Sequence, residues 1–227
     1  MLKAYKYHIY PNKEQRMFFA KTFGCVRFVY NKMLADSIES YQESQDKPDK
    51  SIKHPTAAQY KTDFKFLIGV DSLALANAQM NLNKAYANFF RDKSVGFPQF
   101  KSKKDNYRSY TTNNQKGTVC IENDYIKLLK LKTLVKIKQH RHFFGFIKSV
   151  IISQTSTGKY FVSVLVEENE KLFPKIDTKV GVDIGLKDFA ILSNGIKYEN
   201  PKCLRKLKKR LAFLQRSLSR KRRGQTI

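Results

Sequence analysis

The sequence predicts an α+β fold: a small β-barrel interrupted by a helical segment, then a short segment of strands and one helix. Three observations predict it. A strand pattern at residues 4–10 is matched by further strand patterns between residues 118 and 168. Helical periodicity occupies much of the interval from 13 to 92. Short strand patterns followed by a helical pattern return from residue 180. The strands on both sides of the helical segment can pair and close a barrel.

The first strand places Tyr5, Tyr7 and Ile9 on one face. Asn12 can cap a helix that begins at Lys13, and Gly24 is expected to end it. A second helical pattern follows directly. Its apolar stripe, at spacings of four and three, is Val26, Tyr30, Leu34, Ile38 and Tyr41.

Asp71 and Ser72 signal the start of a longer helix that reaches about Phe90. After it, residues 96–114 alternate aromatic and cationic side chains. Lysine and arginine neutralise phosphates and aromatic rings stack on bases, so this mix suits a nucleic acid. The alternative is an ordinary basic loop that leads into a strand. The candidate contacts are Lys101, Lys103, Lys104, Tyr107 and Arg108.

The charge balance points to a polyanionic partner. The 227 residues contain 44 Lys and Arg against 19 Asp and Glu, a net charge of +25. Self-repulsion of that size opposes compaction unless a polyanion offsets it, so a nucleic acid is the leading partner and an anionic membrane the second. No run of about 18 apolar residues is present to span a bilayer. Cys25, Cys120 and Cys203 lie far apart, which favours reduced thiols, a cytoplasmic location and neither a disulfide framework nor a zinc site.

An acidic residue interrupts the strand pattern that begins at Val180. Asp183 lies in this strand between Gly181 and Gly185, and a carboxylate there is costly to bury unless it is paired or binds a cation. RNase H-like nucleases present their first metal ligand on such a strand, at the start of a hairpin meander. The alternative is a turn-forming residue in an ordinary meander. Asn194–Gly195 predicts the next hairpin.

The last helix is predicted to start at Pro201 with Asn200 as its cap. Its leucines form a heptad seam: Leu204, Leu207, Leu211, Leu214 and Leu218. The rest of the helix is basic, which favours a helix that packs by its apolar edge and grips a nucleic acid by its basic face. The alternatives are a basic coiled coil or a helix without its partner. Candidate contacts are Lys206, Lys209, Arg210 and Arg220.

Four ordered motifs resemble one family. Residues 181–190 resemble the first RuvC motif of TnpB, the OrfB-type protein of bacterial insertion sequences, and residues 10–15, 24–31 and 96–101 match its earlier signatures. The resemblance implies a wedge-like OB barrel from residues 1–12 and 96–172. It implies a helical recognition lobe at 13–95 and a RuvC-like, RNase H-type segment at 179–227.

TnpB proteins are transposon-encoded RNA-guided DNA endonucleases and relatives of type V CRISPR effectors. The resemblance therefore implies guide RNA and target DNA as partners, in a bacterial or phage-borne, nucleoid-associated setting. It makes Asp183 the candidate catalytic residue and Mg²⁺ ligand. It places Thr112 and Asn113 beside the short duplex motif next to the target, as candidate base readers.

The resemblance covers residues 6–224, and the family's later RuvC motifs and zinc ribbon have no counterpart here. Two-metal cleavage needs several carboxylates, and Asp183 alone is an incomplete site. We therefore expect a truncated member that binds neither Mg²⁺ stably nor zinc and does not cut DNA alone. Two alternatives stay open: a nuclease-free repressor or RNA binder, or half of a split nuclease completed by a separate chain.

Overall fold

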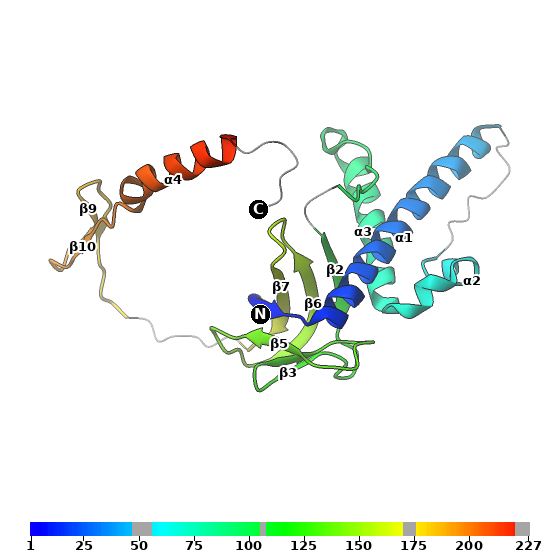
Figure 1. Ribbon diagram of the computed structural model, residues 1–227, viewed down its shortest axis with the longest axis horizontal. Coiled ribbons are helices and arrows are strands. Elements are labelled where there is room, and N and C mark those ends of the chain that lie inside the picture. The colour runs from blue at the N-terminus through cyan, green and yellow to red at the C-terminus, as the bar shows by residue number, and fades with distance from the viewer. Residues whose placement is uncertain (47–55, 105–107, 170–175, 221–227) are drawn as a thin grey trace. The chain divides into compact units, whose positions relative to one another are not determined.

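The computed structural model describes residues 1–46, 56–104, 108–169 and 176–220. It divides into two compact units, Met1–Lys171 and Leu172–Ile227. The first unit holds a seven-stranded antiparallel sheet with the longer helices, and the second holds a three-stranded sheet and one helix (Figure 1). The predicted α+β class is thus confirmed. Among the described helices, none has the length and apolar character to cross a membrane.

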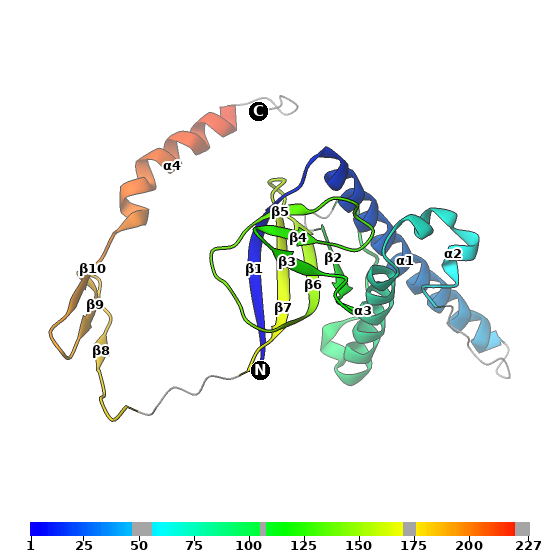
Figure 2. The same cartoon turned by 90° about the horizontal axis from the view of Figure 1, so that it is seen from below.

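The large sheet curls, and its strand order is β2-β6-β7-β1-β5-β4-β3 (Figure 2). The first strand of the chain lies between β7 and β5, so it pairs with strands that follow the helical segment, as predicted. Strands β2 and β3 are edges, because no ladder joins them within the described ranges. The strands are β1 Leu2–Tyr10, β2 Arg108–Asn113, β3 Cys120–Glu122, β4 Tyr125–Lys127, β5 Val135–Lys138, β6 Phe146–Gln154 and β7 Tyr160–Glu167.

Two long helices, α1 and α3, pack together and against the sheet (Figures 1 and 2). The contact with the sheet centres on Phe19, whose ring lies 5.8 Å from Tyr160 and 6.4 Å from Tyr110, centroid to centroid. Asp71 caps α3 by accepting from the Leu73 amide at 3.0 Å, which confirms the predicted start of that helix. The helical elements are α1 Lys13–Asp46, α2 Tyr60–Asp63, the 3₁₀ turns η1 Lys65–Gly69 and η2 Lys93–Val95, and α3 Ser72–Arg91.

The prediction of a helix break at Gly24 is wrong, since α1 continues through it. A glycine inside a helix costs only about 1 kcal/mol relative to alanine. Phe23, Cys25 and Val26 beside it are buried, and their packing offsets that cost. The predicted stripe is buried as far as Leu34 and ends at Tyr41, which is 59% exposed.

The second unit contains the predicted hairpin. Strands β9 and β10 are antiparallel around Asn194–Gly195, and Gly195 has a φ of +86°, which favours glycine. The last helix starts at Cys203 and not at Pro201, because Lys202 has a φ of +47°, which no helix accommodates. The elements are β8 Val182–Asp183, β9 Asp188–Leu192, β10 Lys197–Glu199 and α4 Cys203–Arg220.

Candidate nucleic-acid interface

Two of the sequence motifs meet in space although 70 residues separate them. The Asn31 side chain donates to the Lys101 carbonyl at 2.9 Å and accepts from the Lys101 amide at 2.8 Å. These two hydrogen bonds satisfy both backbone polar groups of Lys101, as a neighbouring strand would. Asn31 therefore positions the basic segment from helix α1.

The side chain of Lys101 is also engaged by α1. Its Nζ lies 4.1 Å from the centroid of the Tyr30 ring, a cation–π contact. Loss of water around the ammonium lowers the pKa of Lys101. This cation contacts the Tyr30 ring, and Lys101 as a whole is still exposed.

Lys103 and Lys104, which follow it, are exposed. The aromatic residues of this segment differ from each other. Phe97 packs edge-on against Tyr86 and Phe89, with 5.7 and 5.5 Å between ring centroids, and is still 42% exposed, while Phe100 is 55% exposed. Tyr107, another predicted contact, lies outside the described residues.

Strand β2 contains the remaining predicted contacts of the first unit. Arg108 is exposed and Asn113 half-buried, so both can reach a ligand. Thr112 is 2% exposed, and its hydroxyl donates to the second carboxylate oxygen of the α3 cap, Asp71. This threonine ties β2 to α3, and a base edge has no access to it. The sequence analysis did not predict strand β2. The buried positions of this strand alternate with less buried ones, but most of its residues are polar, so no apolar alternation is visible in the sequence.

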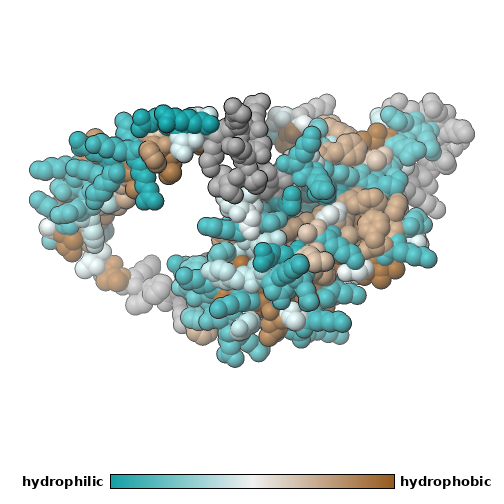
Figure 3. All heavy atoms as spheres, viewed as in Figure 1, coloured by the Kyte–Doolittle hydropathy of each residue, from teal (hydrophilic) through white to brown (hydrophobic). Residues whose placement is uncertain are grey.

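Helix α4 has the predicted cations on its surface. Lys206, Lys209, Arg210 and Arg220 are all exposed, and the helix contains no acidic residue. Its five seam leucines are 48–77% exposed. Figure 3 shows hydrophilic and hydrophobic residues on opposite sides of this helix. The basic residues and the leucines of α4 are therefore both exposed.

Asp183 lies at the end of the short strand β8, opposite Ile191 of β9, and is exposed. The strand is held by its neighbour: the Gly181 amide donates to Ser193 Oγ at 3.0 Å. Within the described ranges, no group of three or more His, Cys, Asp or Glu side chains could hold a metal ion. The donors present around Asp183 therefore do not fit a two-Mg²⁺ centre.

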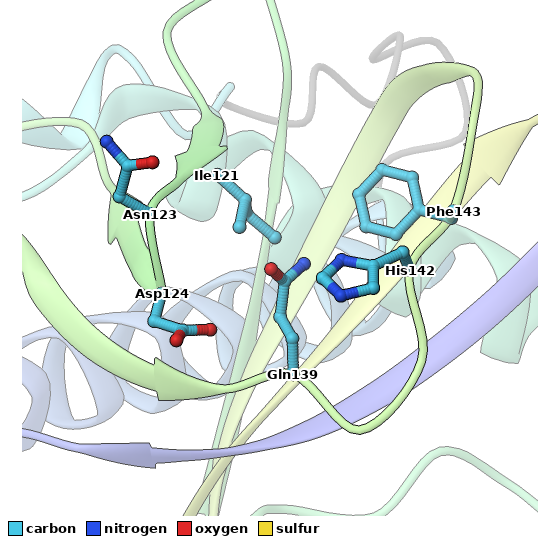
Figure 4. A pocket seen from close by; sticks show the side chains of 6 residues that line it. All are labelled: Ile121, Asn123, Asp124, Gln139, His142 and Phe143. Carbon is cyan, nitrogen blue, oxygen red and sulfur yellow. The ribbon is translucent and has the colours of Figure 1, made fainter.

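One cavity of about 370 Å³ lies between the β3–β4 turn and the loop after β5 (Figure 4). Asp124 and His142 line it together with Gln139, and the Phe143 ring forms part of its wall. Residue spacing did not predict that Asp124 and His142 line one cavity, because 17 residues separate them in the chain. The pocket mixes hydrogen-bonding groups with a ring, but it is shallow and open.

Comparisons with known proteins agree with the motifs. A family model described as a helix-turn-helix domain, HTH_OrfB_IS605, matches residues 1–46, which here form β1 and the single helix α1. A putative RNA-guided DNA endonuclease of Streptomyces pristinaespiralis is 33% identical, over 98% of this chain and 56% of its own length. The putative RNA-guided DNA endonuclease InsQ of Escherichia coli K12 is 32% identical, over 97% of this chain and 54% of its own length.

Among solved structures, a Cas12f1–sgRNA–target DNA complex is 10% identical and covers 97% of this chain and 62% of that one. Its TM-score of 0.36 is too low to establish a common fold. The sequence matches place the chain in the class of OrfB-type proteins of insertion sequences. The chain belongs to the TnpB family. It spans about half the length of the curated relatives that it matches.

Proposed function

We propose that this chain binds a guide RNA and target DNA, as the nucleic-acid-binding part of an RNA-guided DNA endonuclease. The observation that carries the proposal is the alignment of 98% of the chain with a relative named as a putative RNA-guided DNA endonuclease. The net charge of +25 supports it independently, because a polyanion offsets the self-repulsion.

The contacts we propose are the cations that the structure leaves exposed. In the first unit the predicted cations that are exposed are Lys101, Lys103, Lys104 and Arg108, beside the half-buried Asn113. In the second unit they are Lys206, Lys209, Arg210 and Arg220 of α4. Thr112 is excluded from this set by its burial and its bond to Asp71.

We further propose that the curled sheet acts as an OB-like wedge and that β8, β9, β10 and α4 form part of a RuvC-like domain. Asp183 would then supply one carboxylate to a metal centre whose other ligands are not among the described residues. Those ligands could come from a separate chain, with the leucine seam of α4 as the surface for that partner.

The test is the salt dependence of binding, measured by fluorescence anisotropy with a labelled RNA. Each phosphate neutralised releases counterions, so log K falls with log salt with a slope of about −0.7 per contact on a single strand. We expect a steep slope that the change of Lys103 and Lys104 to Gln reduces. An affinity that is the same at low and high salt would contradict the proposal.

Asp183→Ala separates binding from cleavage. We expect RNA affinity to be unchanged, because the residue lies apart in sequence from the proposed contacts of the first unit and carries no positive charge. If a mixture with a candidate partner chain cleaves DNA, the same change should abolish the cleavage. Cleavage that survives the change would remove Asp183 from the metal site.

A further inference from the structure

The face of the large sheet that points away from the core carries an unusual set of side chains. Along β1 and β7 the buried residues alternate with others that point outward; Tyr7 and Val162, for example, are fully buried. Across the strands, His8 lies opposite both Phe161 and Lys138, and Tyr10 lies opposite Lys136. We call the outward set the aromatic–lysine row: Lys6, His8, Tyr10, Phe161, Lys136 and Lys138.

Within this row, the His8 ring contacts both Tyr10 and Phe161. The His8 ring lies 4.3 Å from Tyr10 and 5.0 Å from Phe161, centroid to centroid. Lys6 Nζ lies 5.0 Å from the centroid of Phe161. The rings thus form a continuous run along β1 and β7 with cations beside it, and Tyr10 is 47% exposed.

The row has no role in the core, which forms on the opposite face of the same strands from Tyr7, Ile9 and Val164. None of the ion pairs between described residues involves Lys6, Lys136 or Lys138. Two acids lie on this face of the described strands: Glu167, at the far end of β7, pairs with Lys148 at 2.7 Å, and Glu122 of β3 lies opposite Tyr125, which in turn lies opposite Lys136. The row therefore offers cations that take part in no ion pair between described residues, next to aromatic rings.

This chemistry fits unpaired nucleotides. Lysines neutralise phosphates, and aromatic rings stack on bases whatever their sequence. Paired bases are already stacked inside a duplex and cannot lie on a protein ring. From Lys6 to Tyr10 the strand extends about 14 Å at about 3.4 Å per residue, which is room for a few stacked bases.

We propose that the aromatic–lysine row binds an unpaired segment of nucleic acid, with bases on Phe161, His8 and Tyr10 and phosphates on Lys6, Lys136 and Lys138. The proposal rests on the proposed nucleic-acid function and adds the surface and the single-stranded form of the ligand. It predicts that affinity depends on the bases as well as on the phosphates.

The experiment uses the full chain and fluorescence anisotropy with a 12-nucleotide strand, its abasic counterpart and the matching duplex, in RNA and DNA arms. Stacking on one ring accounts for about 5- to 100-fold in affinity by substitution. We expect Phe161→Leu with Tyr10→Leu to weaken single-strand binding at least tenfold and leave duplex binding unchanged. Phe144→Leu, which removes an 83% exposed ring outside the row, is the matched control.

Two further readouts test the same surface. Wild-type protein should bind the abasic strand at least tenfold more weakly than the normal strand, a result that needs no variant to fold. Lys136→Gln with Lys138→Gln should lower the magnitude of the salt slope by about 0.7 for each lost contact. Lys65→Gln, an exposed lysine in η1, should leave the slope as it is.

The outcomes distinguish this proposal from the proposed function. If the ring variants melt like wild type and bind single strands equally well, the row is not the site, while salt-dependent binding would still support the proposed function. If wild-type protein binds no nucleic acid, both proposals fail. If the ring variants instead lose binding to phosphatidylserine vesicles only, a membrane surface replaces the nucleic acid as ligand. Preference for RNA or DNA identifies which strand occupies the row.

Discussion

The two units of this protein treat their apolar residues differently. In Met1–Lys171 the sheet and helices bury a continuous core that includes Phe19, Leu34 and Val164. In the described part of Leu172–Ile227, only Ala190 is a buried apolar residue, at 8% exposure. Three short strands and one helix cannot enclose a core of their own.

The helices α1 and α4 show the same difference in the burial of their apolar residues. Both carry an apolar stripe at helical spacing, yet Leu34 of α1 is 0% exposed and Leu211 of α4 is 48% exposed. Periodicity predicts which face of a helix is apolar, but it does not say whether anything covers that face. Stability in the first unit should therefore be sensitive to apolar substitution, and stability in the second should not.

The largest expected effect tests that difference directly. Phe19→Ala should destabilise the protein by about 3–5 kcal/mol, because it removes a buried ring that contacts Tyr110 and Tyr160. Leu211→Ala should cost less than about 0.5 kcal/mol, since its side chain is half exposed. Urea unfolding followed by far-ultraviolet circular dichroism measures both. Equal costs would mean that α4 is buried in solution.

A second prediction concerns the buried acid of the first unit. Asp71→Ala should cost about 2–3 kcal/mol, because it removes the cap of α3 and leaves the buried Thr112 hydroxyl without an acceptor. Thr112→Val should cost less, since the cap remains. Nucleic-acid affinity of the folded Thr112→Val protein should equal that of wild type. A selective loss of DNA binding would restore Thr112 as a base reader.

Asn31→Ala should cost about 1–2 kcal/mol, because it breaks two hydrogen bonds to the Lys101 backbone. It should also weaken RNA binding, since Lys103 and Lys104 lose the anchor of their segment. Chemical denaturation and anisotropy measure the two effects. Asn77→Ala, which removes one bond within α3, is the control and should leave RNA affinity unchanged.

High pH should lower the stability of the first unit. Burial raises the pKa of Tyr7 to about 12. A raised pKa in the folded state means that the stabilisation is complete below pH 10 and is lost as pH rises towards 12. We expect the free energy of unfolding to fall above pH 10, and to fall less in Tyr7→Phe. A decline equally steep in the variant would assign the effect to other groups.

The smallest expected effect is an increase in stability. Gly24→Ala should stabilise the protein by about 0.5–1 kcal/mol, because alanine favours the helix and its Cβ would meet no atom within 4 Å. Thermal unfolding measures it. A loss of stability would show that the helix needs the glycine for close packing in solution.

The sequence predicted most strands of the sheet, the pairing of β1 with later strands and the cap of α3 correctly. It missed β2, because Ser109, Thr111 and Asn113 gave the segment the look of a loop. It also predicted that the helix ends at Gly24, because glycine has a low helix propensity. The helix continues there, since the packing of its neighbours offsets that propensity. The proposed function came from the family resemblance, and the roles of the exposed cations stay predictions.

By itself, the sequence determined the family, the charge and the face of each helix, because these depend on residue identity and local spacing. The tertiary structure decided which of those residues are free to act. Burial and side-chain partners assign Thr112 to Asp71 and Lys101 to Tyr30, and they assemble the aromatic–lysine row from β1, β5 and β7. Such contacts join residues far apart in the chain, and no local pattern encodes them.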